Sequence, residues 1–404
     1  MGKQINMPKL RFPEFNEEWE KKMLGEVVDV FDGTHQTPDY LTEGIPFYSV
    51  EQMTANDFHK TKFVSKEVFD KENKRVKIER GDILMTRIGD IGTARYINWD
   101  VNASFYVSIV LIKQSRKCNS EYLCHFIGTQ MFQNELWNRT IHVAFPKKIN
   151  LGEISNCIAS YPALAEQQKI ATFLTSIDEK VTQLKKKKSL LEQYKKGVMQ
   201  KIFSQEIRFK DEHGQDYTEW VDTKLGEIGI FSGGGTPSTK NTDFWMGSIP
   251  WISSSDLVDD SIFKISTTRF ITKAAVSQSA AKIIPPKSVL IVSRVGVGKV
   301  AVNEVELCTS QDFTNIIPNS DNPIFIAYLV KFKTNKLLGL NQGTCIKGFV
   351  KSDLETMNIF LPSVAEQTKI ANFLSAIDDK ITHCSTQIEK MGLWKKGLMQ
   401  KMFC

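Results

Sequence analysis

The chain has 404 residues, of which 41% are hydrophobic and 24% charged, and its formal net charge is +6. This length predicts two to four domains, and this composition is ordinary for a globular chain with buried cores. The N-terminal stretch lacks the apolar core of a signal peptide, and no apolar run is long enough to span a membrane. Seven cysteines without a CxxC pair favour a cytoplasmic protein and argue against a zinc site.

Residues 1–160 form the first of four segments that the sequence predicts. β-branched runs at 27–31, 83–86 and 107–113 predict strands, and the apolar pattern at 121–138 predicts helix. The segment carries 21 basic and 21 acidic side chains. If it binds nucleic acid, it must do so through a local patch or with a basic partner.

Residues 161–207 are predicted to form a long helix that begins close to Pro162, because proline suits a first helical turn. The stretch from Ala165 to Phe203 recurs from Ala365 at an offset of 200, with 19 of 39 positions identical. A helix of 39 residues is about 57 Å long. Apolar residues alternate at spacings of three and four, which is typical of a coiled-coil seam; the first seam includes Ile170, Leu174, Ile177, Val181 and Leu184.

The same helix holds the basic excess of the chain, mainly in Lys185–Lys188. Residues 161–210 carry 11 basic and 5 acidic side chains. A lysine run on a helix is usually a solvated face. We interpret it as a solvated face or a partner contact, with contact to DNA as the alternative.

Residues 208–361 repeat the plan of the first segment. Arg208-Phe209 corresponds to Arg11-Phe12, and Trp220 precedes a Leu-Gly-Glu sequence by five residues, as Trp19 does. Residues 211–361 carry 14 basic and 16 acidic side chains. A strand is expected at 289–292 and a helix at 323–338.

Residues 362–404 are predicted to form the second long helix. Lys188 and Lys195 interrupt the first seam and Lys395 the second, so neither helix presents a clean apolar stripe. Since neither seam is long enough to be buried alone, we expect the two helices to pack on each other. The second seam includes Ile370, Leu374, Ile377, Ile381 and Leu398.

No catalytic or metal-binding motif emerges from the sequence. The glycine run 233–235 lacks the lysine of a phosphate-binding loop, and Gly296 to Lys299 is at most a weak dinucleotide fingerprint. Six scattered histidines include no HExxH pair. The Asn/Asp-Pro-Pro-aromatic sequence of amino-methyltransferases is also missing.

Together the repeated elements resemble the specificity subunit of type I restriction–modification enzymes over essentially the whole chain. The resemblance rests on the two AEQ-x-KIA-x-FL helix starts, the two KKG-x-MQK-x-F helix ends, the paired LGE sequences and the GDILMTR and VLIVSR stretches. It implies an α+β fold with two β-rich target-recognition domains, related by a pseudo-twofold, and a two-helix antiparallel coiled coil.

The resemblance also implies a non-catalytic function. Each recognition domain would bind one half of a bipartite double-stranded DNA site, and the coiled coil would set the spacing and bind two modification (M) subunits. S-adenosylmethionine, and ATP with Mg²⁺ for restriction, would belong to the M and restriction (R) subunits, with no cofactor in this chain. Two alternatives are a coiled-coil scaffold with protein-binding blocks, which the net-neutral blocks favour slightly, and an enzyme in its own right.

Candidate DNA contacts are polar loops that recur in both segments, because base edges and phosphates are bound by such side chains and by backbone N–H groups. Turn formation without a ligand is the alternative for every one of them. Arg87 and Arg294, which we pair as corresponding residues of the two segments, are equally explained as structural anchors. The candidates are Thr34, His35, Gln36, Thr37, Arg87, Arg139, Thr140, His142, Lys147 and Lys148 in the first segment, and Gly234, Gly235, Thr236, Ser238, Lys240, Arg294, Asn341, Gln342, Thr344 and Lys347 in the second.

Overall fold

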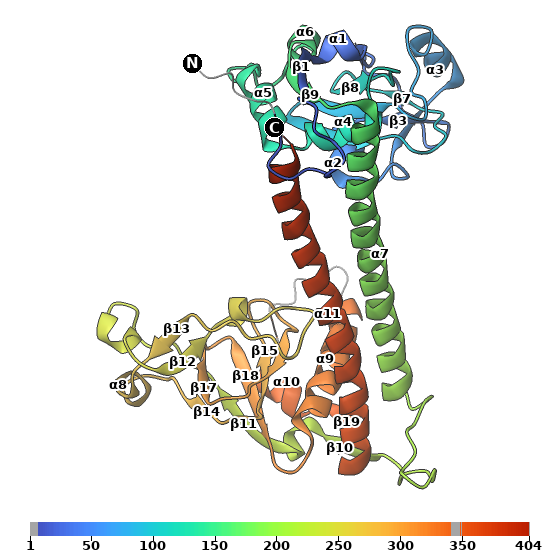
Figure 1. The fold of residues 1–404 in the computed structure, drawn as a ribbon. Coiled ribbons are helices and arrows are strands. Elements are labelled where there is room, and N and C mark those ends of the chain that lie inside the picture. The colour runs from blue at the N-terminus through green and yellow to red at the C-terminus, as the bar shows by residue number, and fades with distance from the viewer. Residues whose placement is uncertain (1–6, 341–347, 349, 404) are drawn as a thin grey trace. The chain divides into compact units, whose positions relative to one another are not determined.

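The computed structural model describes residues 7–340, 348 and 350–403. The chain divides into two compact units: unit 1 comprises residues 1–185 and 386–404, and unit 2 comprises residues 186–385. The division falls inside both long helices, α7 (Leu164–Phe203) and α11 (Val364–Met402) (Figure 1). Each unit therefore contains one β-rich domain, one part of α7 and one part of α11.

The domain of unit 1 is built on two sheets and the short antiparallel pair β1-β9. A four-stranded antiparallel sheet has the order β2-β8-β5-β6, and a three-stranded sheet has the order β4-β3-β7 with β3 and β7 parallel. The strands are β1 (Glu20–Met23), β2 (Val30–Asp32), β3 (Ile45–Tyr48), β4 (Lys62–Val64), β5 (Ile83–Ile88), β6 (Asp90–Tyr96), β7 (Ser104–Phe105), β8 (Ile109–Ile112) and β9 (Ile158–Tyr161). The helices are α1 (Leu24–Val27), α2 (Val50–Ala55), α3 (Lys66–Glu72), α4 (Ser120–Ile127), α5 (Gln130–Asn138) and α6 (Leu151–Ser155).

The domain of unit 2 repeats this topology with one additional strand, β14. Its antiparallel sheet has the order β11-β18-β15-β16, and its mixed sheet has the order β13-β12-β17-β14, with β12 and β17 parallel. The strands are β10 (Val221–Lys224), β11 (Gly229–Gly233), β12 (Ile249–Ile252), β13 (Arg269–Ile271), β14 (Ile283–Ile284), β15 (Val289–Val292), β16 (Val300–Val302), β17 (Leu307–Thr309), β18 (Phe313–Pro318) and β19 (Asn358–Leu361). The α-helices are α8 (Lys273–Ser277), α9 (Pro323–Leu340) and α10 (Lys351–Glu355), with 3-10 turns η1 (Leu225–Glu227), η2 (Thr242–Trp245) and η3 (Ser254–Asp256).

Several elements differ locally from the prediction. The strand expected at 27–31 covers only 30–32, because Leu24 and Val27 are buried in the short helix α1. The helix expected at 121–138 is two helices, because Thr129 accepts a hydrogen bond from Phe132 N at 3.3 Å and starts α5 anew. Residues with side chains that cap a backbone N–H interrupt an otherwise continuous apolar pattern.

Both long helices take part in the core of each unit. In unit 1, Ile170 and Leu174 near the start of α7 pack in the same cluster as Met402 near the end of α11. In unit 2, Ile202 at the end of α7 packs in the same cluster as Ile370 at the start of α11. Because the start of one helix meets the end of the other in each unit, the helices are antiparallel within both.

The described residues hold no candidate membrane span, since none of their helices is long and apolar enough. Nor do they bring together three or more metal-ligating side chains of His, Cys, Asp or Glu.

Candidate nucleic-acid interface

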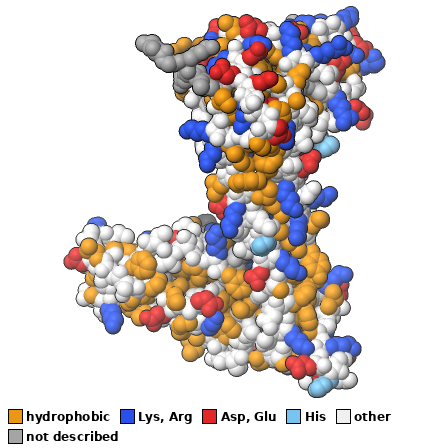
Figure 2. All heavy atoms as spheres, in the orientation of Figure 1, with side chains coloured by type: hydrophobic (Ala, Val, Ile, Leu, Met, Phe, Trp, Pro, Cys, Tyr) orange, Lys and Arg blue, Asp and Glu red, His pale blue; other side chains and the backbone are white. Residues whose placement is uncertain are grey.

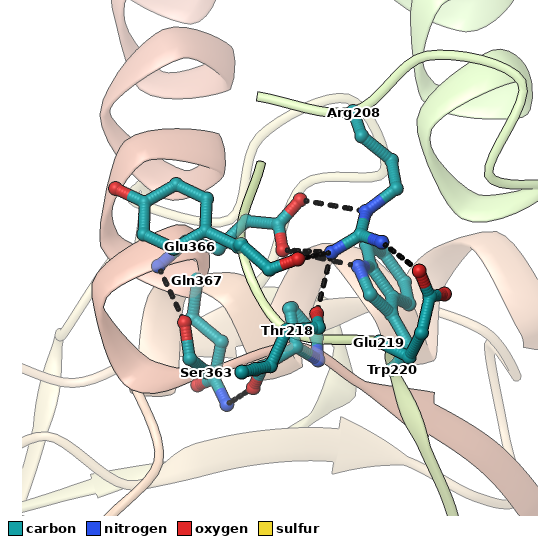
Figure 3. Close-up of polar contacts among 9 residues, drawn as sticks. Arg208, Thr218, Glu219, Trp220, Ser363, Glu366 and Gln367 are labelled. Carbon is teal, nitrogen blue, oxygen red and sulfur yellow. Dashed lines mark hydrogen bonds and ion pairs between the residues drawn. The ribbon is translucent and has the colours of Figure 1, made fainter. Parts of the chain in front are cut away.

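Each domain is attached to its long helix by an arginine–glutamate pair. In unit 1, Arg11 Nε and Nη2 donate to the two carboxylate oxygens of Glu166, both at 2.7 Å. In unit 2, Arg208 Nη2 donates to Glu366 Oε2 at 3.1 Å, and Trp220 Nε1 donates to the same oxygen at 3.2 Å (Figure 3). Both glutamates are fully buried, so the pair fixes the domain to the first turn of its helix.

The glutamine that follows each of these glutamates makes a second attachment. Gln167 Oε1 accepts a hydrogen bond from Asn119 N at 2.8 Å, and Gln367 Oε1 accepts one from Asn322 N at 2.9 Å. Asn119 caps α4 and Asn322 immediately precedes α9. The repeated Ala-Glu-Gln sequence therefore connects each long helix to two separate segments of its own domain.

Two of the three lysines that interrupt the predicted seams, Lys195 and Lys395, are neutralised by aspartates of the other long helix. Within unit 2, Lys195 Nζ donates to both carboxylate oxygens of Asp378, at 2.6 and 2.7 Å. Within unit 1, Lys395 Nζ donates to both oxygens of Asp178 at 2.6 Å. The pairs correspond at the offset of 200 and differ in burial: the side chain of Asp378 is 7% exposed and that of Asp178 is 47% exposed.

A domain residue adjoins each of these ion pairs. Tyr328 Oη donates to Asp378 Oδ2 at 2.5 Å, and the ring Nδ1 of His125 lies 4.0 Å from Asp178 Oδ2. Burial, with a further contribution from Lys395, lowers the pKa of His125 to about 4. The imidazole is therefore neutral at pH 7, and each unit contributes one domain side chain to its lysine–aspartate pair.

The predicted seam residues lie mostly in the interior. The two half-buried ones are Val181 and Leu398. The buried ones are Ile170, Leu174, Ile177, Leu184, Ile370, Leu374, Ile377 and Ile381.

The first predicted recognition loop follows β2 and is held by Asp32, whose anchoring role the sequence did not indicate. Thr34 is buried, whereas His35, Gln36 and Thr37 are exposed. His35 Nε2 lies 2.7 Å from Asp32 Oδ2, and Arg75 Nη2 donates to Asp32 Oδ1 at 2.5 Å. Burial raises the pKa of Asp32, but the hydrogen bonds from Arg75 and His35 more than offset this, so its pKa lies below the ordinary value. Asp32 is thus an ionised carboxylate at the base of an exposed polar loop.

Arg87 and Arg294 do not occupy equivalent places, which corrects the pairing made from sequence. Arg87 N donates to Ser108 O at 2.9 Å, and in unit 2 it is Ser293 N that donates to the corresponding carbonyl, of Asp312, at 2.8 Å. Ser293 therefore occupies the position equivalent to Arg87, and Arg294 lies one residue beyond it. A shift of one residue turns a side chain to the opposite face, and accordingly Arg87 is 7% exposed while Arg294 is on the surface.

The Arg87 guanidinium is used inside the domain. Its Nε donates to Ile149 O and its Nη1 to Val107 O, both at 3.1 Å. Nη1 also lies 3.6 Å from Asp32 Oδ2. These contacts fit the structural anchor that the sequence left open as an alternative.

The predicted contacts from Arg139 to Lys148 in unit 1 include both anchored and exposed residues. Arg139 pairs with Glu135 and Glu153, and Thr140 Oγ1 donates to Leu136 O at 2.7 Å. His142 and Lys147 instead flank the exposed ring of Trp137. The ring centres of His142 and Trp137 are 4.4 Å apart, and Lys147 Nζ lies 4.7 Å from the centre of the Trp137 ring. Lys148 is exposed, and its backbone forms isolated β-bridges with Ile88 and Ile141. The surface part of this loop combines cations with an exposed aromatic ring, a combination frequent at nucleic-acid interfaces.

In unit 2, the glycines of the predicted loop serve packing. A Cβ on Gly234 would lie 2.1 Å from Ser310 O, and one on Gly235 would lie 2.2 Å from the carbonyl carbon of Ala280. The close approach that requires glycine is therefore to this chain's own backbone, which gives these two residues a structural explanation. The exposed residues are Thr236, which bonds Gln311, together with Ser238 and Lys240.

The last four candidates, Asn341, Gln342, Thr344 and Lys347, lie outside the described residues. In the view of Figure 2, basic and acidic side chains are interspersed over the domain of unit 1, in keeping with its equal numbers of charges. The residues that sequence reasoning missed are acidic anchors and their arginine partners. Asp32 and Arg75 are 43 positions apart, so no local pattern connects them.

Comparison with known proteins identifies the family. The family model of the type I restriction modification DNA specificity domain matches twice, over residues 16–193 and 217–390. The MjaIX specificity subunit of Methanocaldococcus jannaschii is 37% identical over 200 residues, which are 47% of this chain and about half, 46%, of that subunit. The putative MjaX specificity subunit of the same organism is 24% identical over 98% of this chain and 95% of its own length.

Solved structures show the same fold. The S subunit of a type I restriction–modification system from M. genitalium has a TM-score of 0.63 at 15% identity, over 98% of this chain and 99% of that one. A chain from a structural study of complex assembly in the type I system has a TM-score of 0.58 at 16% identity, over 95% and 97%. The scaffold alternative finds no support among these proteins. With two matched domains that together span most of its length, the chain belongs to the family of type I restriction–modification DNA specificity proteins.

Proposed function

We propose that this chain is the DNA-specificity subunit of a type I restriction–modification enzyme and that each unit recognises one half of a bipartite target. The observation that carries the proposal is the duplication of a complete unit: the sheet order, the arginine–glutamate pair and the lysine–aspartate pair all occur twice. The loops differ between the units, as two different half-sites require. As a specificity subunit the chain is not itself a catalyst.

The partners of the chain are then double-stranded DNA, M subunits and, in the restricting complex, R subunits. S-adenosylmethionine belongs to M, and ATP with Mg²⁺ to R. The chain contributes recognition by its domains and spacing by its paired helices.

Two features of the long helices support the binding of two M subunits. Gly197 and Gly397 correspond at the offset of 200, and beyond the adjoining backbone of its own helix a Cβ on either would meet no atom of the described residues within 4 Å. Glycine inside a helix costs about 0.5–1 kcal/mol relative to alanine, so packing within the chain gives no reason for it. The aromatic side chains three residues earlier, Tyr194 and Trp394, are 53% and 51% exposed. We infer that each glycine leaves room for an M subunit that contacts the neighbouring aromatic ring.

The test is to map methylated bases in cells that carry the M subunit with and without this chain. We expect one split motif, two short sequences separated by a fixed unread spacer, to be methylated only when the chain is present. If removing the chain abolishes no methylated motif, or abolishes a continuous motif instead of a split one, the proposal is contradicted. Native mass spectrometry with saturating M tests the stoichiometry, for which a stable one-to-one complex is the contrary result.

A further inference from the structure

A solvent-exposed arginine lies beside the recognition loop of unit 1, with part of its guanidinium fixed by a buried carboxylate. The Arg75 side chain is 55% exposed, while that of Asp32 is 10% exposed. Arg75 Nη2 donates both to Asp32 Oδ1 and to the backbone carbonyl of Asp32. Asp32 immediately precedes the loop of residues 33–37, so the arginine is held at the base of that loop.

Unit 2 contains a similar arrangement made from other elements: Arg75 lies in the turn after α3, whereas its counterpart in unit 2 lies on a strand. Arg269, the first residue of β13, donates through Nη2 to Ser253 Oγ at 2.7 Å and to Asp256 Oδ2. Its guanidinium lies 4.6 Å above the Trp251 ring, and Trp251 Nε1 donates to Gly235 O at 2.9 Å. The arginine is thus connected through one indole to the glycine loop, and its side chain is 38% exposed.

The donors that remain available decide what these arginines can bind. A guanidinium grips two neighbouring acceptors either through Nε and Nη2 or through Nη1 and Nη2. Nη2 is occupied by the carboxylate in both units, whereas Nε and Nη1 make no hydrogen bond to the described residues. The two-point contact by which arginine specifies guanine is therefore blocked, while single-donor contact to a phosphate oxygen remains open.

Charge favours the same ligand. Arg75 and Arg87 both lie next to Asp32, so these three side chains carry one net positive charge before His35 is considered. The whole segment 1–160 has no net charge, so attraction of DNA must come from such local excesses.

We propose that Arg75 and Arg269 each bind a backbone phosphate of the DNA, one in each half-site, and that Asp32 and Asp256 are the residues that position them. This inference rests on the proposed function, because it assigns the DNA backbone to a place beside each recognition loop. The contacts fix the position of the loops on the duplex and carry no base specificity.

The experiment measures binding of the split target by the full chain assembled with its M subunits, over about 50 to 200 mM KCl. Each phosphate contact adds about 0.9 to the slope of log K against log salt concentration. We expect Arg75→Gln and Arg269→Gln each to lower the slope by about 0.9 and the double variant by about 1.8. When KCl rises from about 50 to 200 mM, the affinity of each single variant should fall by a factor about three to four times smaller than the factor for the wild type.

The matched controls each remove one positive charge from the same domain. They replace an exposed lysine that forms a surface ion pair. Lys66→Gln in α3 and Lys287→Gln in unit 2 fulfil this, since Lys66 pairs with Asp70 and Lys287 with Glu304. We expect wild-type slopes for both. Arg75→Lys should also keep the slope, because the charge stays beside the loop.

The outcomes separate cleanly. Weaker binding with an unchanged slope would mean that the arginines are only structural, and an altered methylated motif would mean that they contact bases; either result overturns the proposal. Equal slope losses in the lysine controls would do so as well. The two arginines lie in different domains, so each glutamine variant is a separate test. Absence of a split motif in the wild type would instead contradict the proposed function.

Discussion

Replacement of Lys195 and of Lys395 by methionine should destabilise the protein to very different degrees. Both lysines pair with an aspartate of the other long helix within their unit. Lys195→Met leaves Asp378 without its cationic partner in a site where its side chain is 7% exposed. Breaking a buried pair in this way costs about 3–5 kcal/mol.

The Lys395 pair provides the internal comparison. The side chain of Asp178 is 47% exposed, so water can solvate its charge when the lysine is lost. For pairs with this access to solvent, the loss is about 0.2–1 kcal/mol. We therefore expect Lys195→Met to cost at least about 2 kcal/mol more than Lys395→Met.

Urea unfolding gives the total cost, and hydrogen exchange measured by mass spectrometry locates it in peptides of one unit. Faster exchange should appear in α9 and the second half of α7 for Lys195→Met. Adding Asp378→Asn should restore much of the stability, because the amide can still accept the hydrogen bond of Tyr328 without a buried charge. Equal costs for the two lysine variants, or no recovery in the double variant, would refute the reasoning from burial.

Three other outcomes are expected. The pKa of His125 is about 4 in the folded protein and about 6.5 in the unfolded chain. Its contribution to the free energy of unfolding is therefore complete above pH 6.5 and is lost as the pH falls. Between pH 7 and 5 the free energy of unfolding should fall by about 2 kcal/mol. Unfolding curves should show this loss in the wild type and a smaller one in His125→Tyr. Tyrosine is chosen because Tyr328 occupies the corresponding position in unit 2. Gly197→Leu or Gly397→Leu should not destabilise the protein in urea, because it removes the cost of about 0.5–1 kcal/mol that glycine imposes inside a helix. Each variant should reduce the M subunits bound in native mass spectra from two to one; two bound in both variants would place the contact elsewhere. Four residues inserted after Lys188 lengthen the helix by about 6 Å and a little over one turn, so the methylated spacer should grow by one or two base pairs with both half-sites kept, and an unchanged spacer would exclude the helices as its determinant.

The sequence was most informative where the repeat supplied two independent copies of one pattern. The seam positions, from Ile170 in the first copy to Ile381 in the second, were predictable because an interior face imposes the same spacing twice. Lys195 and Lys395 were visible only as interruptions. Their aspartates lie 183 and 217 positions away, and nothing local indicates which acidic residue will face them.

The recognition loops were less predictable, because several local patterns there have two physical explanations. Glycine at 234 and 235 fits close approach of a ligand as well as close packing of the chain on itself, and the contacts of Ser310 and Ala280 favour packing. The pairing of Arg87 with Arg294 failed by one residue, since an alignment of short motifs does not detect a shift in strand register. Arg75 and Arg269 escaped notice because they come from different parts of the fold in the two domains.

The order of the segments along the chain has a consequence for folding during synthesis. Unit 2 is one continuous stretch, residues 186–385, whereas unit 1 requires residues 386–404 in addition to residues 1–185. Met402 and Phe403 are buried in the core that contains Trp19 and Tyr122. A ribosome therefore delivers everything that unit 2 needs before it delivers the residues that complete unit 1, although domains generally fold in N-to-C order. The N-terminal domain must wait with part of its apolar core uncovered, and it is the more exposed of the two to chaperones and proteases until the second long helix arrives.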